Sequence, residues 1–377
     1  MRYRLASILL VSWAFTGCTA AEDTAEVVFD PARLHEVEIT VDAAYLDELA
    51  TDLDERVPCT VVYDGERVPG SGIRQKGNTL VDLDDKPSFS VKFDEFDDTA
   101  DLHGLNKILL NNSKQDSTFL RARLGADVHA RAGIPAARVA HAQVTFNGVD
   151  KGIYVVVEAI DGDFLRLHFG EEHAEGNLYE GPCCGDFVDD VEHMELEDET
   201  KDGRSRDDLR ALAQIIEETP DTALAAALEQ RLDLGRFMKS YALEALLGHW
   251  DGFAFRANNH YIYNNPATGL LVFMPHGMDR ILEDPAFDPE TTPVTRLPLR
   301  IRAIPALDAW FHAELAELAG SAWSASALHA AIDQAASVLH TAGPGAQASK
   351  DLADFDEHVG ALRDIVTTRT DAIAPTP

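Results

Sequence analysis

Positive charge is scarce in this sequence, which has 32 lysines and arginines against 65 aspartates and glutamates in 377 residues. The formal net charge is −33. A surface of that sign repels the phosphates of DNA and RNA, so the composition argues against a nucleic-acid-binding protein. It also repels free ATP at long range. Any nucleotide site must therefore be a local basic pocket or depend on bound metal ions.

Long apolar runs are also lacking, and the N-terminal run Leu5–Phe15 is too short to span a bilayer stably. It follows a basic start and precedes small residues and Cys18, which is typical of a lipoprotein-type secretory signal. We expect a signal peptide over residues 1–17, lipid on Cys18, and an acidic tether over residues 18–30. The protein would then be exported and held at the membrane of the cell envelope. Because Phe15 stands where leucine is more usual, secretion without lipid stays open.

Cysteine is scarce too, with four in the chain. Export would place Cys59, Cys183 and Cys184 in an oxidising compartment, where disulfides form. Three is an odd number, so at least one of them stays unpaired within the chain. We expect Cys59 to bridge one of the two adjacent cysteines. Metal ligation by the adjacent pair is disfavoured, because no histidine lies at a suitable spacing from it.

The first half of the chain is rich in short segments in which hydrophobic and polar residues alternate, the pattern of β-strands. The Asn147-Gly148 pair between two of these segments is a strong hairpin signal. Helical spacing is confined here to residues 43–54, 118–132 and 163–169. The predicted strands are 37–41, 59–63, 68–76, 89–93, 107–110, 142–146 and 152–158.

From Asp207 onward the apolar residues are spaced by three and four, which predicts helices. A β-rich part followed by a helical part predicts an α+β protein with two lobes around a cleft. We place the β-rich N-lobe at residues 31–165 and the mainly helical C-lobe at residues 166–377. The predicted helices are 207–218, 222–230, 233–248, 307–319, 326–342 and 352–374, and the Pro/Thr-rich stretch 285–305 is predicted to be a connection.

The stretch 249–282 combines acids, an amide and a hairpin in the helical half. Asp251 follows an apolar helix, and Asn259 comes eight residues later. Two short apolar runs around a Pro/Gly/Asn turn then predict a β-hairpin over residues 260–274. Asp279 follows that hairpin. Because a hairpin brings its two ends together, we expect Asp251, Asn259 and Asp279 to be neighbours in space.

Such a set suits phosphoryl transfer. One acid orients or deprotonates the attacking hydroxyl, while the amide oxygen and the second acid hold Mg²⁺ on the nucleotide phosphates. The alternative is that acids and asparagines around a hairpin are ordinary surface groups, as happens by chance in many chains. A zinc site of His249, His260 and His276 is a further alternative, but their spacing matches no known zinc framework.

Several short segments stand in a fixed order along the chain. They are Ile73-Arg-Gln-Lys-Gly-Asn, Lys86-Pro-Ser-Phe-Ser-Val-Lys-Phe, Leu110-Asn-Asn, Asp116-Ser-Thr-Phe-Leu-Arg121, the stretch from Asn147 to Asp161, Gly176-Asn-Leu-Tyr, and the block from Asp251 to Asp279. In this order they resemble the spore-coat CotH kinase family of atypical protein-kinase-like proteins. The resemblance runs from Ile73 to Asp279 and continues more loosely to the C-terminus. Each segment alone is weak, whereas seven in order are strong.

The resemblance implies an atypical protein-kinase-like, two-lobed fold that binds ATP with Mg²⁺ or Mn²⁺. It implies phosphorylation of serine or other acceptors on surface or secreted proteins. Residue by residue, it makes Asp251 the catalytic-loop acid, and Asn259 and Asp279 metal ligands. Asn258 competes with Asn259 for its role, since this segment is longer than the shortest family version.

The resemblance also implies three cofactor-binding residues in the N-lobe. Lys86 heads a strand and should reach the nucleotide phosphates, with Lys76 and Lys92 as competitors. Arg74 is either a fork for phosphate or a surface residue. Glu158 ends an apolar strand, and a buried carboxylate needs a basic partner, for which Lys86 and Arg74 are the natural choices.

One departure from the family bears on activity. The family commonly has Pro-Trp-Asp-x-Asp after the hairpin, and here the segment is Pro275-His-Gly-Met-Asp279. The first acid has become Gly277, so Asp279 is the carboxylate left in the motif, with His276 as a weaker substitute. This leaves two hypotheses. The chain is an exported, ATP- and metal-dependent kinase acting on envelope or secreted proteins, or it is a surface scaffold on the same fold with a decayed site. Phosphate transfer and AMP transfer both stay open, and nothing in the sequence specifies an oligomeric state.

Overall fold

The structure, a computed structural model, describes residues 23–170, 174–197 and 205–373. The predicted signal peptide and Cys18 lie outside the described residues. Of the predicted tether, residues 24–29 form a short 3₁₀ helix, η1 (Thr24–Phe29), that is capped by the Asp23 carboxylate. Within the described ranges, no helix has the length and apolar character that crossing a membrane requires.

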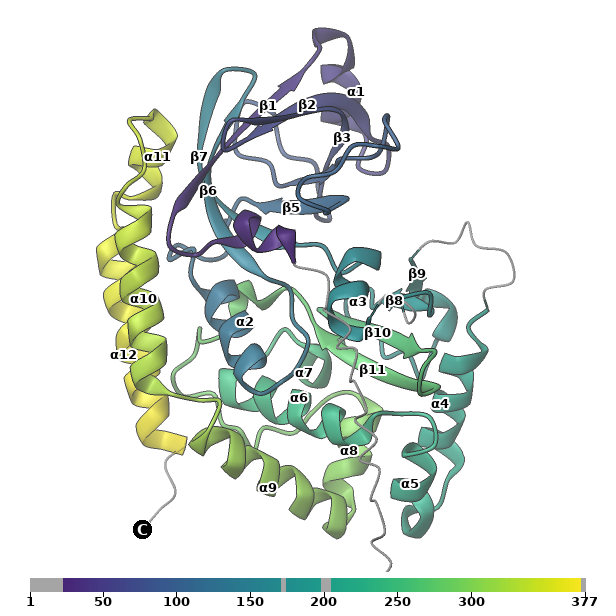
Figure 1. Ribbon diagram of the computed structural model, residues 1–377. Helices are drawn as coiled ribbons and strands as arrows, with labels where there is room; N and C mark the ends of the chain where they lie inside the picture. Colours follow the sequence, from purple (N-terminus) through teal and green to yellow (C-terminus); the bar gives the residue numbers. More distant parts are fainter. Residues whose placement is uncertain (1–22, 171–173, 198–204, 374–377) are drawn as a thin grey trace, which may run out of the picture.

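A closed β-barrel forms the first half of the molecule (Figure 1). Its strands follow the order β1-β2-β3-β4-β5-β7-β6, and the barrel closes because β1 pairs with β6 in parallel. Every other pairing in it is antiparallel. The strands are β1 (Leu34–Val41), β2 (Val57–Tyr63), β3 (Glu66–Gln75), β4 (Phe89–Lys92), β5 (Lys107–Asn111), β6 (Val139–Phe146) and β7 (Val149–Glu158).

The hydrophobic residues of the alternating segments fill the interior of the barrel. In β1 and β2 every second side chain is buried, because successive side chains of a strand point to opposite faces. The β6–β7 turn has positive φ at both Asn147 (46°) and Gly148 (78°), as a two-residue turn of this kind requires. The Asn147 carboxamide also bonds to both the N–H and the C=O of Val41, so the turn is joined to the end of β1.

Three helices come between or after the barrel strands in sequence, and the last of them packs on the sheet of the second lobe. α1 (Leu46–Thr51) follows β1, α2 (Arg121–Arg131) lies between the barrel and the second lobe, and α3 (Gly162–Phe169) follows β7 (Figure 1). The α2 face towards the second lobe includes Gly125, where an added Cβ would lie 2.7 Å from the sulfur of Met278. A glycine at this point therefore lets the two lobes approach closely.

The second lobe is mainly helical and contains a four-stranded sheet of order β11-β10-β8-β9. Its strands are β8 (Leu178–Glu180), β9 (Glu195–Leu196), β10 (His260–Asn265) and β11 (Leu270–Pro275). Its helices are α4 (Asp207–Glu218), α5 (Asp221–Leu228), α6 (Leu234–Leu247), α7 (Phe253–Arg256), α8 (Arg296–Ala303), α9 (Pro305–Gly320), α10 (Ala325–Leu339), α11 (Ala346–Asp351) and α12 (Phe355–Ile373).

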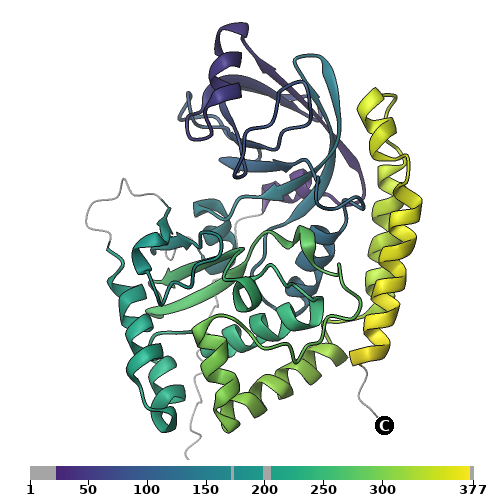
Figure 2. The same ribbon diagram turned by 180° about the vertical axis from the view of Figure 1, so that it is seen from behind.

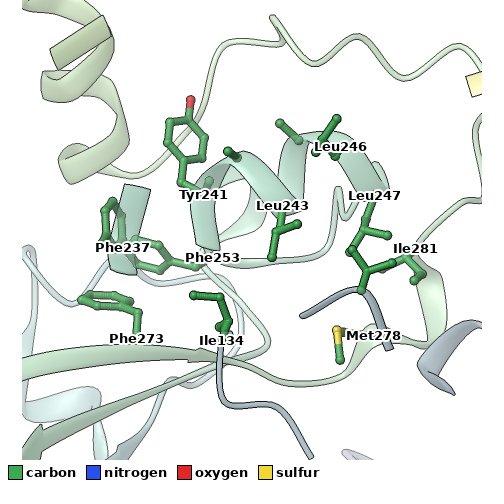
Figure 3. Packing of buried hydrophobic residues seen from close by; sticks show 14 of the residues in the cluster. Ile134, Phe237, Tyr241, Leu243, Leu246, Leu247, Phe253, Phe273, Met278 and Ile281 are labelled. Atoms are coloured by element: carbon green, nitrogen blue, oxygen red, sulfur yellow. The ribbon is translucent and has the colours of Figure 1, made fainter. Parts of the chain in front are cut away.

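The core of the second lobe lies around α6, which is buried along most of its length. Phe237 of α6, Phe253 of α7 and Phe273 of β11 pack together, with Phe273 at 4.9 Å from both other rings, centroid to centroid (Figure 3). Fully burying a phenylalanine side chain stabilises a fold by about 1.5–3 kcal/mol. The short helix α7 is therefore anchored by its first residue to the helix before it and the hairpin after it.

The C-terminal strap, which we define as α11 and α12, runs along both lobes (Figures 1 and 2). At its start, the Asp150 carboxylate of β7 accepts hydrogen bonds from the backbone N–H groups of Gln347 and Ala348. At the end of α11, Asp351 accepts from the Lys86 ammonium at 2.8 Å and from the Ile153 N–H at 2.7 Å. The last helices of the chain are thus bonded to the barrel, although they come after the second lobe in sequence.

The predicted α+β class, with a β-rich N-lobe and a mainly helical C-lobe, is confirmed. The connection predicted over residues 285–305 is partly wrong, because α8 occupies its second half. Pro298 lies inside that helix within its first turn, where the missing N–H of proline is tolerated.

The disulfide expected between Cys59 and the adjacent pair is wrong. Cys183 and Cys184 are bonded to each other. Cys59 is free, and its side chain is buried on the inner face of β2, inside the barrel. Burial raises the pKa of its thiol to about 12. The two ends of the expected bridge therefore lie in different lobes.

Candidate functional site

The loop that carries Asp251 is held from beneath by a buried acid. α6 ends at Gly248 in the left-handed region (φ 59°), and Asp251 comes three residues later. The Glu244 carboxylate of α6 accepts hydrogen bonds from the backbone N–H groups of Phe253 and Ala254, at 3.2 and 2.8 Å. Burial raises the pKa of Glu244 to about 8, against the opposing effect of these two bonds. Glu244 thereby fixes the chain just after Asp251.

Asn259 is bonded directly to Asp251. Its side-chain Nδ2 donates to the Asp251 backbone oxygen at 2.9 Å and to the Asp251 carboxylate at 3.1 Å. Asn259 has a positive φ (50°), a conformation that asparagine tolerates better than most residues. No side-chain bond of this kind is found for Asn258 among the described residues. The amide that reaches the acid is therefore Asn259.

Asp279 lies next to this pair because of the hairpin. His260 pairs with Pro275 in the β10–β11 register, and the His276 N–H donates to the Asn259 carbonyl at 3.0 Å. Burial raises the pKa of Asp279, and the charges of Asp116 and Asp251 raise it further. Its own backbone N–H and the Lys76 ammonium lower it. Asp251 and Asp279 are thus within electrostatic reach of each other.

Gly277 fits closely against Asn259. A Cβ added at Gly277 would lie 2.3 Å from the Asn259 Oδ1, and the backbone here has φ of 55°. The Asn259 amide oxygen therefore faces the segment in which the family carries its first acid. In this chain the amide takes up room that a side chain at position 277 would need.

The three histidines near this loop do not form a metal site. Within the described ranges, no three or more His, Cys, Asp or Glu side chains gather in a way that could hold a metal ion. Burial lowers the pKa of His249 to about 3 and that of His260 to about 4, and it also lowers the pKa of His276. These rings are therefore neutral and packed into the lobe at physiological pH.

A hollow of about 490 Å³ of space not filled by atoms, partly open to solvent, lies where the two lobes meet. One wall comes from the barrel and α2, and the other comes from the segment after β11. The side chains that face it are mostly apolar, with two opposite charges among them. It is lined by Lys76, Leu109, Asn111, Ala122, Ala137, Val139, Val157, Pro275, His276, Gly277, Met278 and Asp279.

Lys76 is the basic residue of this hollow. It comes directly after β3, and burial lowers the pKa of its ammonium group. The charges of Asp279 and Glu180 oppose that shift. No carboxylate of the described part of the chain forms an ion pair with it. Its side chain is thus half-buried where the lobes meet, opposite Asp279.

The three predicted cofactor-binding residues are not gathered around the hollow. Lys86 pairs with Asp351 of the strap at 2.8 Å, and this pair is mostly buried. Arg74 donates to the carbonyls of Leu53 and Gln75, at 2.9 and 3.2 Å. Nucleotide contact by Lys86 or Arg74 stays a prediction. In the structure the Lys86 ammonium and the Arg74 guanidinium both have partners within the protein.

The expected partner of Glu158 is wrong. Glu158 is buried, as expected for the end of an apolar strand, but its carboxylate pairs with Arg138. Arg138 approaches it with its Nη2 at 2.5 Å and its Nε and backbone N–H at 3.0 Å. The reason is the register of the β6–β7 hairpin, which sets the residue before β6 opposite the end of β7.

We predict that Arg138→Met lowers the free energy of unfolding by about 3 kcal/mol, since it leaves the buried Glu158 carboxylate without its cation. Arg210→Met is the matched control, because Arg210 pairs with Glu192 and Asp207 on the exposed surface, where such pairs contribute little. Chemical denaturation of both variants measures the difference. Equal effects of the two substitutions would contradict the prediction.

The roles of two residues near the site, Asp116 and Arg121, were not predicted from the sequence. Asp116 is buried, accepts the N–H of Thr118 and of Arg121, and pairs with the Arg121 guanidinium at 2.7 Å. Arg121 in turn donates to the carbonyls of Ile281 and Leu282, just after Asp279. The signal was present, because the segment from Asp116 to Arg121 is one of the seven in the family's order, but its acid was given no role.

Comparison with known proteins gives a consistent result. A family model described as "CotH kinase protein" matches residues 73–373. The chain is 24% identical over 243 residues to "Inner spore coat protein H" of Bacillus subtilis, covering 62% of this chain and 65% of that protein. It is 24% identical over 174 residues to "Invasin CotH2" of Rhizopus delemar, covering 43% of this chain and 29% of that protein. The chain therefore spans less than two thirds of the length of either curated relative.

Two solved structures are also similar to this chain. One is the Helicobacter pylori proinflammatory kinase CtkA, at 10% identity and a TM-score of 0.30, covering 76% of this chain and 95% of that one. The other is from a complex of Shewanella oneidensis HipA, HipB and operator DNA, at 11% identity and a TM-score of 0.29, covering 72% and 60%. Likeness at these TM-scores is too weak to support an inference about the site or its chemistry.

Proposed function

This chain belongs to the CotH kinase protein family, and on that premise we propose that it is an exported kinase that uses ATP and Mg²⁺ or Mn²⁺ to phosphorylate envelope or secreted proteins. The kinase-like character comes from the family. Export and anchorage through Cys18 rest on the N-terminal sequence, and the acceptor class rests on the resemblance. The strongly acidic composition agrees with a nucleotide site that is confined to one local pocket.

The observation that carries the proposal is the hollow between the lobes. Its walls are mostly apolar and come from both lobes, and its polar end has Lys76 on one side and Asp279 on the other. An apolar pocket with a few convergent polar groups is the usual form of a small-molecule site. A half-buried lysine that forms no ion pair within the described residues is available for an anionic ligand. ATP has both the apolar base and the anionic phosphates that such a site would take.

Each polar side chain of the site has a separate role in this proposal. Asp251 accepts the proton of the acceptor hydroxyl or orients that hydroxyl for attack. Lys76 contacts the phosphates, the role that the resemblance gives to Lys86. Asn259 and Asp279 offer the oxygen donors that Mg²⁺ and Mn²⁺ prefer, and a bound ion would neutralise charge on the phosphates. The fit is adequate but has one carboxylate fewer than the family motif.

A scaffold without catalytic activity is the second candidate, and Gly277 is the observation that favours it. The acid that the family carries at this point is absent, and the Asn259 amide lies against the glycine. In a decayed site we would expect the hollow to remain as a relic of the fold. Nucleotide binding without transfer, or no binding at all, would then be measured.

The test compares two lysines by thermal shift with ATP and Mg²⁺ or Mn²⁺. Ligand at about 100 times Kd should stabilise the folded protein by about 2.7 kcal/mol. We expect Lys76→Met to lose most of this shift, because it removes the cation of the hollow. Lys86→Met is the matched control, and it should lower the melting temperature without ligand while keeping the shift, because Lys86 is paired with Asp351.

A shift that is lost in Lys86→Met and kept in Lys76→Met would contradict this assignment and return the phosphate contact to Lys86. A wild-type protein that shows no shift with either metal would contradict nucleotide binding altogether. The same two variants thus test the ligand and the residue that holds it.

A further inference from the structure

Arg369, near the end of α12, is among the largest fully buried side chains of the protein, with 1% of its surface exposed. Among the described residues, its guanidinium group donates only to backbone carbonyls. Nε and Nη2 donate to Leu246 at 2.9 and 2.6 Å, Nη2 also donates to Ala245 at 2.9 Å, and Nη1 donates to Phe287 at 2.9 Å. One side chain therefore joins three carbonyls from two distant segments.

No carboxylate of the described residues forms an ion pair with this arginine. Burial lowers the pKa of Arg369 to about 10, and the charge of Asp284 opposes that shift. A buried cation without a counter-ion is costly, so its position calls for a physical reason. The reason is the partial negative charge at the C-terminus of α6, where the last carbonyls of a helix have no partner within it.

The two segments that Arg369 joins flank the two acids of the proposed site, Asp251 and Asp279. Ala245 and Leu246 lie in the last turn of α6, a few residues before Asp251. Phe287 comes after Asp279 in the connection to α8. These segments also meet at a backbone bond, from the Leu282 N–H to the Leu247 carbonyl at 2.9 Å.

The surroundings of Gly248 show how closely the end of α6, the segment around Phe287 and the Arg369 side chain pack. An added Cβ at this glycine would lie 3.3 Å from Phe287 and 3.5 Å from the Arg369 Nη1. Figure 3 shows the neighbouring contacts, with Leu247 at the end of α6 beside Ile281 and Met278 of the second segment. Arg369 thus lies at the point where the end of α6 and the segment after Asp279 come together.

We propose that Arg369 is a positioning residue of the phosphoryl-transfer site. It fixes the position of Asp251 relative to Asp279 by holding the segments next to them. This inference rests on the proposed function. Typical protein kinases order the segment after their metal-binding acid by phosphorylation. In this chain an arginine of the C-terminal strap is bonded to that segment at the Phe287 carbonyl.

The test compares Arg369→Lys and Arg369→Ala with Arg363→Lys. Arg363 lies on the same helix and pairs with Asp333 at the partly exposed surface, so its substitution controls for changes to α12. Misplacement of a reacting group by about 1 Å costs on the order of 10²-fold in rate. We expect kcat of both Arg369 variants to fall by about tenfold or more, with KM for ATP changed by less than about threefold. Millimolar guanidinium should restore part of the kcat of Arg369→Ala.

Hydrogen exchange measured by mass spectrometry provides a readout that does not depend on activity. We expect faster exchange in Arg369→Lys in peptides that cover residues 245–252 and 281–288, with no change in the barrel strands. A lower melting temperature with unchanged kcat and unchanged exchange in these peptides would overturn the proposal, because Arg369 would then be only structural. A wild-type protein without transfer activity contradicts the proposed function, while the exchange experiment still decides whether Arg369 couples the two segments.

Discussion

Replacing Asp251 with alanine is expected to abolish phosphoryl transfer while leaving nucleotide binding in place. A positioned base contributes about 10²–10⁴-fold to rate, and Asp251 is the acid proposed for that role. Its substitution removes the carboxylate that accepts from Asn259 but none of the side chains that line the hollow. Transfer from labelled ATP to the protein itself, with Mn²⁺ or Mg²⁺, measures the loss. The thermal shift with ATP should persist.

Asp288→Ala is the matched control, because Asp288 is an exposed acid of the connection after Asp279. It should transfer phosphate at the wild-type rate. Full activity of Asp251→Ala would remove this residue from the mechanism. Absence of transfer from the unmodified protein with either metal would end the kinase proposal and favour the scaffold.

Restoring the family's acid at position 277 is expected to harm the protein. In Gly277→Asp the new Cβ would lie 2.3 Å from the Asn259 amide oxygen, and the left-handed backbone at this position disfavours most side chains. The added carboxylate would also join Asp251, Asp279 and Asp116. We expect the free energy of unfolding to fall by about 1–3 kcal/mol, as for other strained backbone positions, and no gain in transfer.

Gly269→Asp provides the control for backbone conformation. Gly269 also has a positive φ (68°), but an added Cβ there meets nothing within 4 Å. Chemical denaturation should therefore show a smaller loss for Gly269→Asp than for Gly277→Asp. A Gly277→Asp variant that gains metal-dependent transfer would show that Asn259 gives way, and that the wild-type site has lost activity through this glycine.

Much of the fold could be predicted because its signals are local. Alternating residues marked the barrel strands, and Asn147-Gly148 marked the hairpin between β6 and β7. The spacing of apolar residues marked α6, and two apolar runs around a turn marked β10 and β11. The same local hairpin places Asn259 beside His276 and brings Asp279 towards Asp251. Each of these features is determined within about 30 residues of sequence.

The lysine of the site could not be chosen on such grounds. Lys76, Lys86 and Lys92 lie in or next to neighbouring strands, and nothing local distinguishes them. The pairing of Lys86 with Asp351 joins residues 265 positions apart. The pairing of Glu158 with Arg138 depends on the hairpin register rather than on the residue types. Long-range contacts therefore decided which cation was left facing the hollow.

The contacts of Arg369, near the other end of the chain, are also long-range and could not be predicted from the sequence. Arg369 joins Leu246, 123 positions away, and its partners are backbone carbonyls, which every sequence contains. No pattern of side chains in the sequence could have predicted these contacts of Arg369. The bond between Cys183 and Cys184 is a similar case, because pairing with Cys59 was excluded only by the place of β2 within the barrel.

The parallel pairing of β1 with β6 constrains how this protein can be made. Leu34 of β1 pairs with His141 of β6, more than 100 residues later in synthesis. This strand must therefore wait for most of the barrel before it finds its β6 partner, and contacts of such long range fold slowly. Until then its unpaired edge is exposed to association with other chains. Folding of this protein should accordingly depend on a factor that keeps the nascent chain apart from its neighbours.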